Sequence, residues 1–373
     1  MKTTWSCVLA TLVMAAGCGG SEFDADDSTI EAEGTSTEAL QQVTGQSLFE
    51  SATFGGNGRT CLTCHSSETG TFSLAEAKAR YLANSCEPLF RPIDSDTGNG
   101  ASYQRLLKYG TLIVTIPLPP GVKLADAPQA KSVRLERNTP STINTPALDP
   151  VLMWDGRATS LEDQATGAIL GHAQAPAAPS ASNLSKIADY EETLFSSTEL
   201  KKYAAGGPAP ALPAGSTASQ KRGRLFFVDV PFSPPSLHGF CASCHSGPLL
   251  NTTNQYNPLQ PAGVRFSTAF VSEFNVRNIP PRTYLFKLPG GGTTSVSTPD
   301  PGRALITGNV ADVNTFKIPV LRNIKNTAPY FHDGSAKTLD DVVNEYQKFA
   351  IFFTGLSFTQ QELDDMVAYM KIL

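Results

Sequence analysis

The sequence predicts a mostly α-helical chain that contains one small fold twice. The pattern Cys-x-x-Cys-His occurs at residues 61–65 and again at 241–245, and each copy follows an apolar segment with Leu-Phe near its end. Strand signals are few, and the best of them, at 112–117, is short. A stretch made almost wholly of Ala, Gly and Pro, residues 204–215, separates the two copies and is typical of a linker.

The two motifs predict two covalently bound haems. Two residues between the cysteines let both sulfurs reach one porphyrin edge, and the next histidine then falls over the iron as its proximal ligand. With seven Cys and five His in 373 residues, two chance matches are not expected. A redox dithiol or half of a zinc site is the alternative, but neither needs a histidine directly after the second cysteine. The predicted haem-binding residues are Cys61, Cys64, His65, Cys241, Cys244 and His245.

Residues 1–20 have the pattern of an export signal. Lys2 supplies the positive charge, 8–16 form an apolar core, and a small-residue cleavage site ends at Cys18. This cysteine resembles the acylated residue of bacterial lipoproteins, although Ala15 stands where leucine is usual; ordinary secretion is the alternative. The apolar core is too short to span a membrane, so we expect membrane attachment only through a lipid anchor. Both interpretations place the mature protein in the periplasm or on the outer membrane of a bacterium.

The remaining chain divides into a tether and two halves. Residues 21–37 are acidic and small, which predicts a disordered tether. We expect an N-terminal haem domain over 38–203 and a C-terminal haem domain over 216–373, since the chain is long enough for two cores. The net charge of −5 and the lack of a basic run argue against nucleic acid as a partner. Cys86 has no obvious partner, and no disulfide framework is expected.

Three helices carry readable start signals. Capping-box patterns occur at residues 160–163, opening a helix toward His172, at 338–341, opening a helix from Leu339 to about Phe349, and at 359–362 before the final helix. Apolar helix faces are also expected at Leu40, Val43 and 47–49, at 223–227, and at Leu363, Met366, Val367 and Met370.

Longer segments resemble a known family. Residues 153–165 (MWDGRATSLEDQA) resemble the segment between the haems of bacterial di-haem cytochrome c peroxidases. Residues 316–323 (FKIPVLRN) and 327–335 (TAPYFHDGS) are similar to the signature of their C-terminal domain. The resemblance covers roughly 38–373, while 66–130 match only loosely and look like an insertion.

The resemblance implies two cytochrome c-like domains, with one covalent haem each, that face each other across an interface with a calcium ion between them. In that arrangement Trp154 is the aromatic relay between the haems; a core aromatic is the alternative. Asn138 and the carbonyls of Thr327 and Pro329 are the implied calcium ligands, in keeping with the preference of calcium for oxygen.

Two departures from the family concern the N-terminal haem. Peroxidases that need reductive activation carry a distal histidine shortly before an Arg-Asn pair, yet residues 127–136, before Arg137, contain none. We therefore expect an open or water-filled sixth position that meets peroxide directly. The position of the family's acid-base glutamate holds Gln174, which hydrogen-bonds but does not titrate. His172 is either its substitute, through a neutral imidazole, or only a polar residue at a helix end. Gln164 completes the candidate catalytic set.

Tyr346 is the predicted sixth ligand of the C-terminal haem. Leu339, Val342, Val343 and Tyr346 fall at helical spacing, which places Tyr346 on the buried face. The corresponding ligand is a Met in the reductively activated peroxidases and a Tyr in the MauG-type enzymes; a core tyrosine is the alternative here. An anionic phenolate stabilises the ferric and higher states, whereas Met ligation raises the potential.

The resemblance thus implies an exported di-haem cytochrome that reduces hydrogen peroxide at the N-terminal haem. Electrons would pass through the C-terminal haem from an unidentified donor, which is a small cytochrome, a cupredoxin or a protein substrate. The alternatives are a MauG-like enzyme that oxidises a protein substrate and a non-catalytic di-haem electron carrier.

Overall fold

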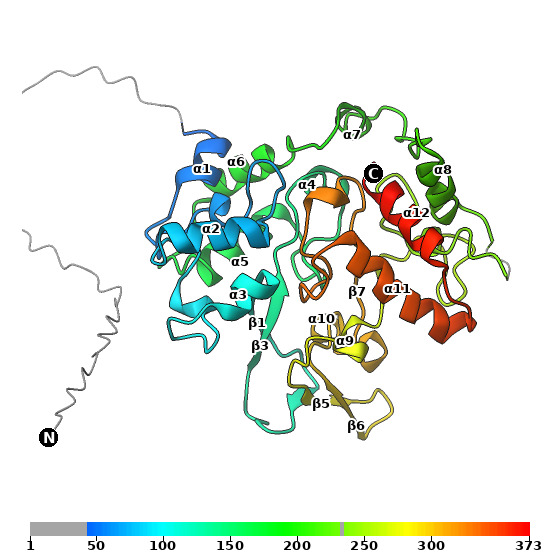
Figure 1. The fold of residues 1–373 in the computed structure, drawn as a ribbon. Helices are drawn as coiled ribbons and strands as arrows, with labels where there is room; N and C mark the ends of the chain where they lie inside the picture. Colours follow the sequence, from blue (N-terminus) through cyan, green and yellow to red (C-terminus); the bar gives the residue numbers. More distant parts are fainter. Residues whose placement is uncertain (1–42, 232–234) are drawn as a thin grey trace, which may run out of the picture. The chain divides into compact units, whose positions relative to one another are not determined.

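Helices make up most of the regular secondary structure in the residues that the computed structural model describes, 43–231 and 235–373 (Figure 1). The predicted signal at 1–20, the tether at 21–37 and Leu40 lie outside these residues. The α-helices are α1 (Gly45–Ser51), α2 (Leu74–Ala83), α3 (Gln104–Tyr109), α4 (Thr145–Leu148), α5 (Leu161–Gly171), α6 (Ala181–Glu191), α7 (Thr198–Ala204), α8 (Ala218–Arg224), α9 (Val271–Phe274), α10 (Ala304–Thr307), α11 (Leu339–Thr354) and α12 (Gln360–Met370). Single 3₁₀ turns are η1 (Cys61–Thr63), η2 (Pro92–Asp94), η3 (Leu225–Phe227), η4 (Cys241–Ser243), η5 (Val310–Asp312) and η6 (Ile324–Asn326). Helices thus outnumber strands, and the predicted fold class is supported in this coarser form, as helices with some sheet.

Three small antiparallel sheets accompany the helices. Their strands are β1 (Thr111–Pro117), β2 (Val122–Leu124), β3 (Ser132–Asn138), β4 (Phe266–Ser267), β5 (Arg282–Lys287), β6 (Thr293–Thr298) and β7 (Phe316–Lys317). The pairings are β1–β3, β2–β5–β6 and β4–β7, and β1 aligns Thr111 with Asn138 at one end and Pro117 with Ser132 at the other. The expected strand at 112–117 is therefore present, and it pairs with β3, a strand that the sequence did not indicate.

One helix crossing occurs in both halves of the chain. A Cβ atom added to Gly45 of α1 would lie 1.8 Å from the Lys186 carbonyl oxygen of α6, and one added to Gly223 of α8 would lie 1.9 Å from that of Asp365 in α12. Only glycine permits this approach, because any side chain would overlap the facing backbone. The two pairs of helices thus cross at the same kind of contact.

The rings next to these crossings repeat as well. Phe49 lies four residues after Gly45 and packs against Tyr190 of α6 with ring centroids 5.4 Å apart. Phe227 lies four residues after Gly223 and packs against Tyr369 of α12 at 5.3 Å. This repetition is what duplication of one haem-binding unit predicts, although residues 43–373 cluster as one compact unit.

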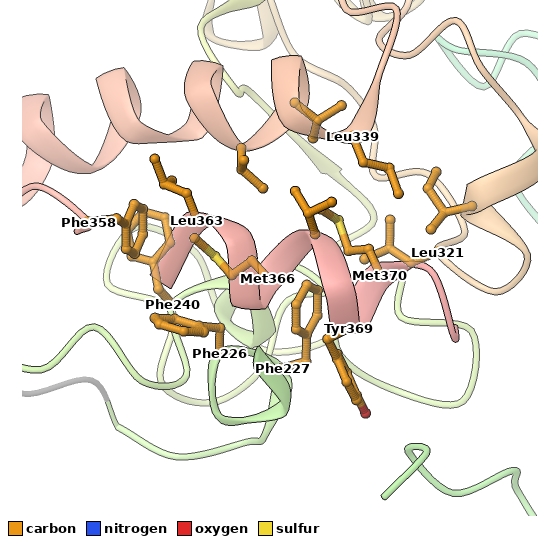
Figure 2. Packing of buried hydrophobic residues seen from close by; sticks show 14 of the residues in the cluster. Phe226, Phe227, Phe240, Leu321, Leu339, Phe358, Leu363, Met366, Tyr369 and Met370 are labelled. Atoms are coloured by element: carbon orange, nitrogen blue, oxygen red, sulfur yellow. The ribbon is translucent and has the colours of Figure 1, made fainter. Parts of the chain in front are cut away.

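The C-terminal core forms around α12. Figure 2 shows α12 between α11 and the segment that carries Phe226 and Phe227, with Leu363, Met366 and Met370 among the buried side chains. The expected apolar stripe is confirmed, and so is its start, because the Thr359 hydroxyl accepts from the Glu362 amide at 3.3 Å. Capping residues at Ser160 and Thr338 likewise precede α5 and α11.

Two expectations at the N-terminal side are wrong. Val43 does not belong to the apolar face of the first helix: it is 48% exposed, and α1 begins only at Gly45 because Thr44 is the N-cap. Cys86, which has no obvious partner in the sequence, is disulfide-bonded.

The segment after α7 has no helix or strand from 207 to 215, and the C-terminal half holds it in place. Arg322 donates to the carbonyls of Pro210 and Ala211 at 2.8 and 3.2 Å, and the Tyr369 hydroxyl donates to that of Pro213 at 2.9 Å. Within the described residues, no helix combines the length and the apolar character needed to cross a membrane.

Candidate functional site

Both Cys-x-x-Cys-His segments fold into the same local structure. η1 and η4 are single 3₁₀ turns that begin at Cys61 and Cys241. In each, the amide of the histidine donates to the carbonyl of the first cysteine, at 3.0 Å for His65 and 2.8 Å for His245. The turn fixes the spacing of the two sulfurs and the imidazole before anything is bound.

The two imidazoles are held in one tautomer. Nδ1 of His65 lies 2.7 Å from the carbonyl oxygen of Gly70, and Nδ1 of His245 lies 2.9 Å from that of Leu250. A carbonyl only accepts hydrogen bonds, so Nδ1 carries the proton and the Nε2 lone pair is available for iron. Burial lowers the pKa of each histidine to about 4, which keeps both rings neutral at physiological pH.

The four motif thiols lie in apolar surroundings that suit thioether bonds. Burial raises the pKa of Cys61 and Cys241 to about 12 and that of Cys64 to about 11, and it also raises the pKa of Cys244. Catalytic dithiols and zinc ligands need thiolates, which such sites disfavour. Nowhere in residues 43–231 and 235–373 do three or more His, Cys, Asp or Glu gather to hold a metal ion. The donor set therefore fits haem better than zinc.

A cavity beside the second motif has a largely apolar lining that suits a haem. Its lining includes Cys241, His245, Trp154 and Met366. Tyr346 of α11 also lines it, with its hydroxyl 3.4 Å from His245 Nε2, and burial raises the Tyr346 pKa. The side chain is half-buried.

Trp154 lies in the wall of the same cavity. Its indole Nε1 donates to the backbone carbonyl and to Oδ1 of Asn138, both at 3.0 Å. Its own carbonyl accepts from the Lys317 amide of β7 at 2.8 Å. The ring is edge-on to His332, with centroids 6.5 Å apart. Hydrogen bonds to β3 and β7 thus fix both the ring and the backbone of Trp154.

A buried ion-pair network supports the Trp154 loop. Arg137 binds both oxygens of Asp300 at 2.7 and 2.9 Å and one oxygen of Asp155 at 2.5 Å. Asp155 also accepts from Arg157 at 2.9 Å. Burial acts to raise the pKa of Asp155 and Asp300, but the Arg137 guanidinium outweighs it and holds both pKa values below the ordinary range. Arg137, Asp155 and Asp300 therefore all remain charged.

The implied calcium ligands lie together but already bind each other. Asn138 Nδ2 donates to the Pro329 carbonyl at 2.7 Å, while Asn138 Oδ1 accepts from Trp154. Thr327 lines the same cavity. Calcium takes six to eight oxygen ligands, and this arrangement does not present the Asn138 and Pro329 oxygens to one ion. The calcium ion remains a prediction.

The catalytic candidates of the N-terminal half lie beside the first motif. His172 caps the C-terminus of α5, and its Nδ1 is buried with no hydrogen-bond partner among the described residues. Burial lowers its pKa, so the ring is neutral. Gln174 is exposed and has a left-handed backbone (φ 55°), and its Oε1 accepts from Asn57 Nδ2 at 2.9 Å. Gln164 is half-buried on α5, two turns before His172.

Asn57 lies in the loop just before Cys61, and its Nδ2 also donates to the His172 carbonyl at 3.0 Å. His172 and Gln174 are therefore held next to the first motif. Trp154 lines the cavity at the second motif instead.

Sequence reasoning missed a buried ion pair next to Cys61. Arg59 is 2% exposed, and its Nη1 lies 2.6 Å from Asp94 Oδ2 and 3.3 Å from the His172 carbonyl oxygen. Asp94 belongs to the segment that looked like an insertion, and Arg59 also donates to the Pro88 and Leu89 carbonyls of that segment. The segment is thus part of the wall around the first motif. A single arginine near a cysteine gives no sequence pattern that would reveal this.

Comparison with known proteins supports the resemblance seen in the sequence. A family model described as di-haem cytochrome c peroxidase matches residues 41–203. The chain is thus similar to the di-haem cytochrome c peroxidases over these residues. This similarity supports covalently bound haem c as the cofactor.

Over the matched stretches, about a quarter of the residues of this chain are identical to those of proteins from three bacteria. It is 27% identical over 263 residues to cytochrome c peroxidase Ccp of Escherichia coli K12, covering 63% of this chain and 47% of that protein. It is 26% identical over 250 residues to cytochrome c551 peroxidase of Nitrosomonas europaea, covering 63% and 65%. It is 26% identical over 281 residues to the methylamine utilization protein MauG of Methylophilus methylotrophus, covering 66% and 70%. The matched region spans about half of the first of these relatives and just under two thirds of the second.

Proposed function

We propose that the chain is an exported di-haem c-type cytochrome that reduces hydrogen peroxide at the N-terminal haem, with electrons relayed through the C-terminal haem. The observation that carries this proposal is the pair of matching motifs. Each has a neutral histidine whose Nδ1 proton is held by a carbonyl five residues further on. Bound haem would supply the iron that exchanges electrons; the chain supplies its attachment, orientation and proton handling. Relatedness to cytochrome c peroxidases supports peroxide as the oxidant.

His172 is the group that handles the proton at the N-terminal site. Cleaving the peroxide bond requires a base that takes a proton from one oxygen and returns it to the other. His172 Nδ1 is buried, unpaired and next to the first motif, and its lowered pKa keeps the ring able to accept a proton. Gln174, tied to Asn57, contributes hydrogen bonding only.

Trp154 carries electrons between the two sites, and its fixed indole suits that role because a relay must keep constant distances to both haems. Its two hydrogen bonds to Asn138 hold the ring at the wall of the C-terminal cavity. The electron donor is a small cytochrome, a cupredoxin or a protein substrate. Export through residues 1–20 and a lipid anchor at Cys18 complete the proposal.

One observation favours a MauG-like enzyme that oxidises a protein substrate. The Tyr346 hydroxyl lies 3.4 Å from His245 Nε2, the atom that would bind the iron of a haem held there. A phenolate ligand would stabilise the ferric and higher states and make this haem a store of oxidising equivalents.

A steady-state assay of the holo protein tests the proposal. Hydrogen peroxide should oxidise a reduced small cytochrome in the presence of the protein, and His172→Gln should lower turnover by about 10²- to 10⁴-fold. His238→Gln is the matched control, since His238 is exposed, and its turnover should equal that of the parent. If peroxide does not oxidise the cytochrome, the proposed function is wrong, and the remaining alternatives are an electron carrier and a MauG-like enzyme. Unchanged turnover in His172→Gln would remove His172 from the mechanism.

A further inference from the structure

Glu191, the last residue of α6, is a buried carboxyl group that the proposed mechanism does not use. Only 4% of the residue is exposed, and its Oε2 atom has no hydrogen-bond partner among the described residues. Glu191 lies on the inward face of α6, one turn after Ile187 and Ala188, which are also buried. A carboxyl group in such a place is costly to ionise, and most buried acids are paired.

The surroundings of Glu191 belong to the first haem site. α6 packs against α1 and α5, and the shared core contains Leu48, Phe49 and Ile169. Cys61 packs against this core, and the negative charge of Glu191 helps to raise the Cys61 pKa. The carboxyl group is therefore electrostatically coupled to the point where the N-terminal haem is attached.

No cation compensates Glu191 among the elements packed on it. The charged residue of α1, Glu50, lies at the surface next to the Tyr190 hydroxyl, 3.4 Å away. Asp149, which follows α4, is paired with Lys317 and Arg265. Of the remaining titratable groups, η1 contributes the Cys61 thiol, α5 contributes Glu162 and Asp163 in its first turn and His172 at its end, and α6 itself carries Lys186 and Asp189. Burial alone raises the pKa of Glu191 to about 8, so the carboxyl group titrates close to neutral pH.

We propose that Glu191 is the redox-linked proton site of the N-terminal haem. When the iron gains one electron from the donor, the Glu191 carboxylate takes up one proton from solvent and becomes the neutral acid. When the iron loses the electron, the acid returns the proton to solvent. An added electron makes the apolar surroundings more negative and so raises the proton affinity of a nearby buried carboxylate. The inference rests on the N-terminal haem of the proposed function but requires no turnover of peroxide.

A redox titration of the holo protein as a function of pH tests this role. In the parent, the midpoint potential of the N-terminal haem should fall with rising pH across the range where Glu191 titrates, with one proton taken up per electron. Glu191→Gln should abolish that slope, whereas Glu192→Gln, at the neighbouring exposed position, should retain it. The reduced-minus-oxidised infrared spectrum of the parent should contain a protonated-carboxyl stretching band that Glu191→Gln lacks.

Equal pH slopes in the parent and Glu191→Gln, or an infrared band that survives the substitution, would overturn the inference. The infrared difference spectrum of the parent alone decides the matter if Glu191→Gln does not fold, because a spectrum without any protonated-carboxyl band refutes the role. A protein with the predicted slope but no peroxide turnover would refute only the proposed function. A protein with turnover and a flat slope would refute only the role of Glu191.

Discussion

Replacing Gly223 by alanine should destabilise the protein by separating α8 from α12. An ideal Cβ at this position would lie 1.9 Å from the Asp365 carbonyl oxygen and 2.9 Å from the Tyr369 Cβ, whereas ordinary van der Waals contact begins at 3.4 Å. The nearest atom belongs to the backbone of a buried helix, so no side-chain rotation relieves the overlap. α12 carries the stripe of Leu363, Met366 and Met370, and any shift of the helix also disturbs that core.

The size of the effect follows from two opposing contributions. Overpacking a filled core costs about 1–3 kcal/mol, and the upper part of that range applies because the obstacle is backbone. Alanine recovers at most about 1 kcal/mol through its higher helix propensity. We expect a net loss of about 2 kcal/mol, which for a cooperative unit of this size corresponds to a fall of roughly 3 °C in the melting temperature.

Thermal unfolding of the holo protein, followed by far-ultraviolet circular dichroism and by haem absorbance, measures this loss. Gly45→Ala, with a Cβ 1.8 Å from the Lys186 carbonyl oxygen, should behave in the same way. Gly167→Ala is the control, because α5 leaves nothing within 4 Å of its Cβ, and it should raise stability by up to about 1 kcal/mol. A Gly223→Ala variant as stable as Gly167→Ala would show that the crossing is looser than the structure indicates.

Four further predictions concern the haems and the titrating groups. Trp154→Phe removes both indole hydrogen bonds to Asn138 and should slow electron exchange between the haems without loss of haem; single-turnover kinetics equal to the parent's would exclude the relay. Tyr346→Phe should raise the midpoint potential of one haem and change its ferric spectrum, and no change in either would make Tyr346 a core residue. Mass spectrometry of the exported protein should show two haem additions, reduced to one by Cys241→Ala with Cys244→Ala. Glu191 has a pKa of about 8 when folded and 4.5 as its ordinary value, so between these pH values the folded chain binds more protons than the unfolded chain. Parent stability in urea should therefore fall with rising pH by up to about 1.4 kcal/mol per unit, and that of Glu191→Gln should not.

Patterns between residues close in the sequence predicted many of the helices. The capping boxes at Thr338 and Thr359 depend on residues three apart, and the structure has helices that begin one residue after each of them. Helical spacing also placed Tyr346 toward the interior, where its hydroxyl faces His245. The motifs predict the haem-attachment positions because their spacing sets the distance between the two sulfurs and the histidine.

What the sequence could not show depends on contacts between distant residues. β3 has only two alternating apolar residues, Val133 and Leu135, which is too short a pattern to predict a strand from the sequence. It becomes a strand through pairing with β1. Arg59 and Asp94 are 35 residues apart, so only the folded chain brings their charges together. Glu191 belongs to an ordinary amphipathic helix, and only the packing of α6 on α1 reveals that its carboxyl group is buried.

The Arg137 network has a consequence for how the protein loses its structure. Arg137 lies near the end of β3 in the N-terminal half, Asp155 lies in the loop of Trp154, and Asp300 lies beyond β6 in the C-terminal half. Removing one partner from a buried ion pair costs about 3–5 kcal/mol, so a substitution at Asp300 should destabilise the loop of Trp154 as well as its own half. We therefore expect the two halves to melt cooperatively, as a single body.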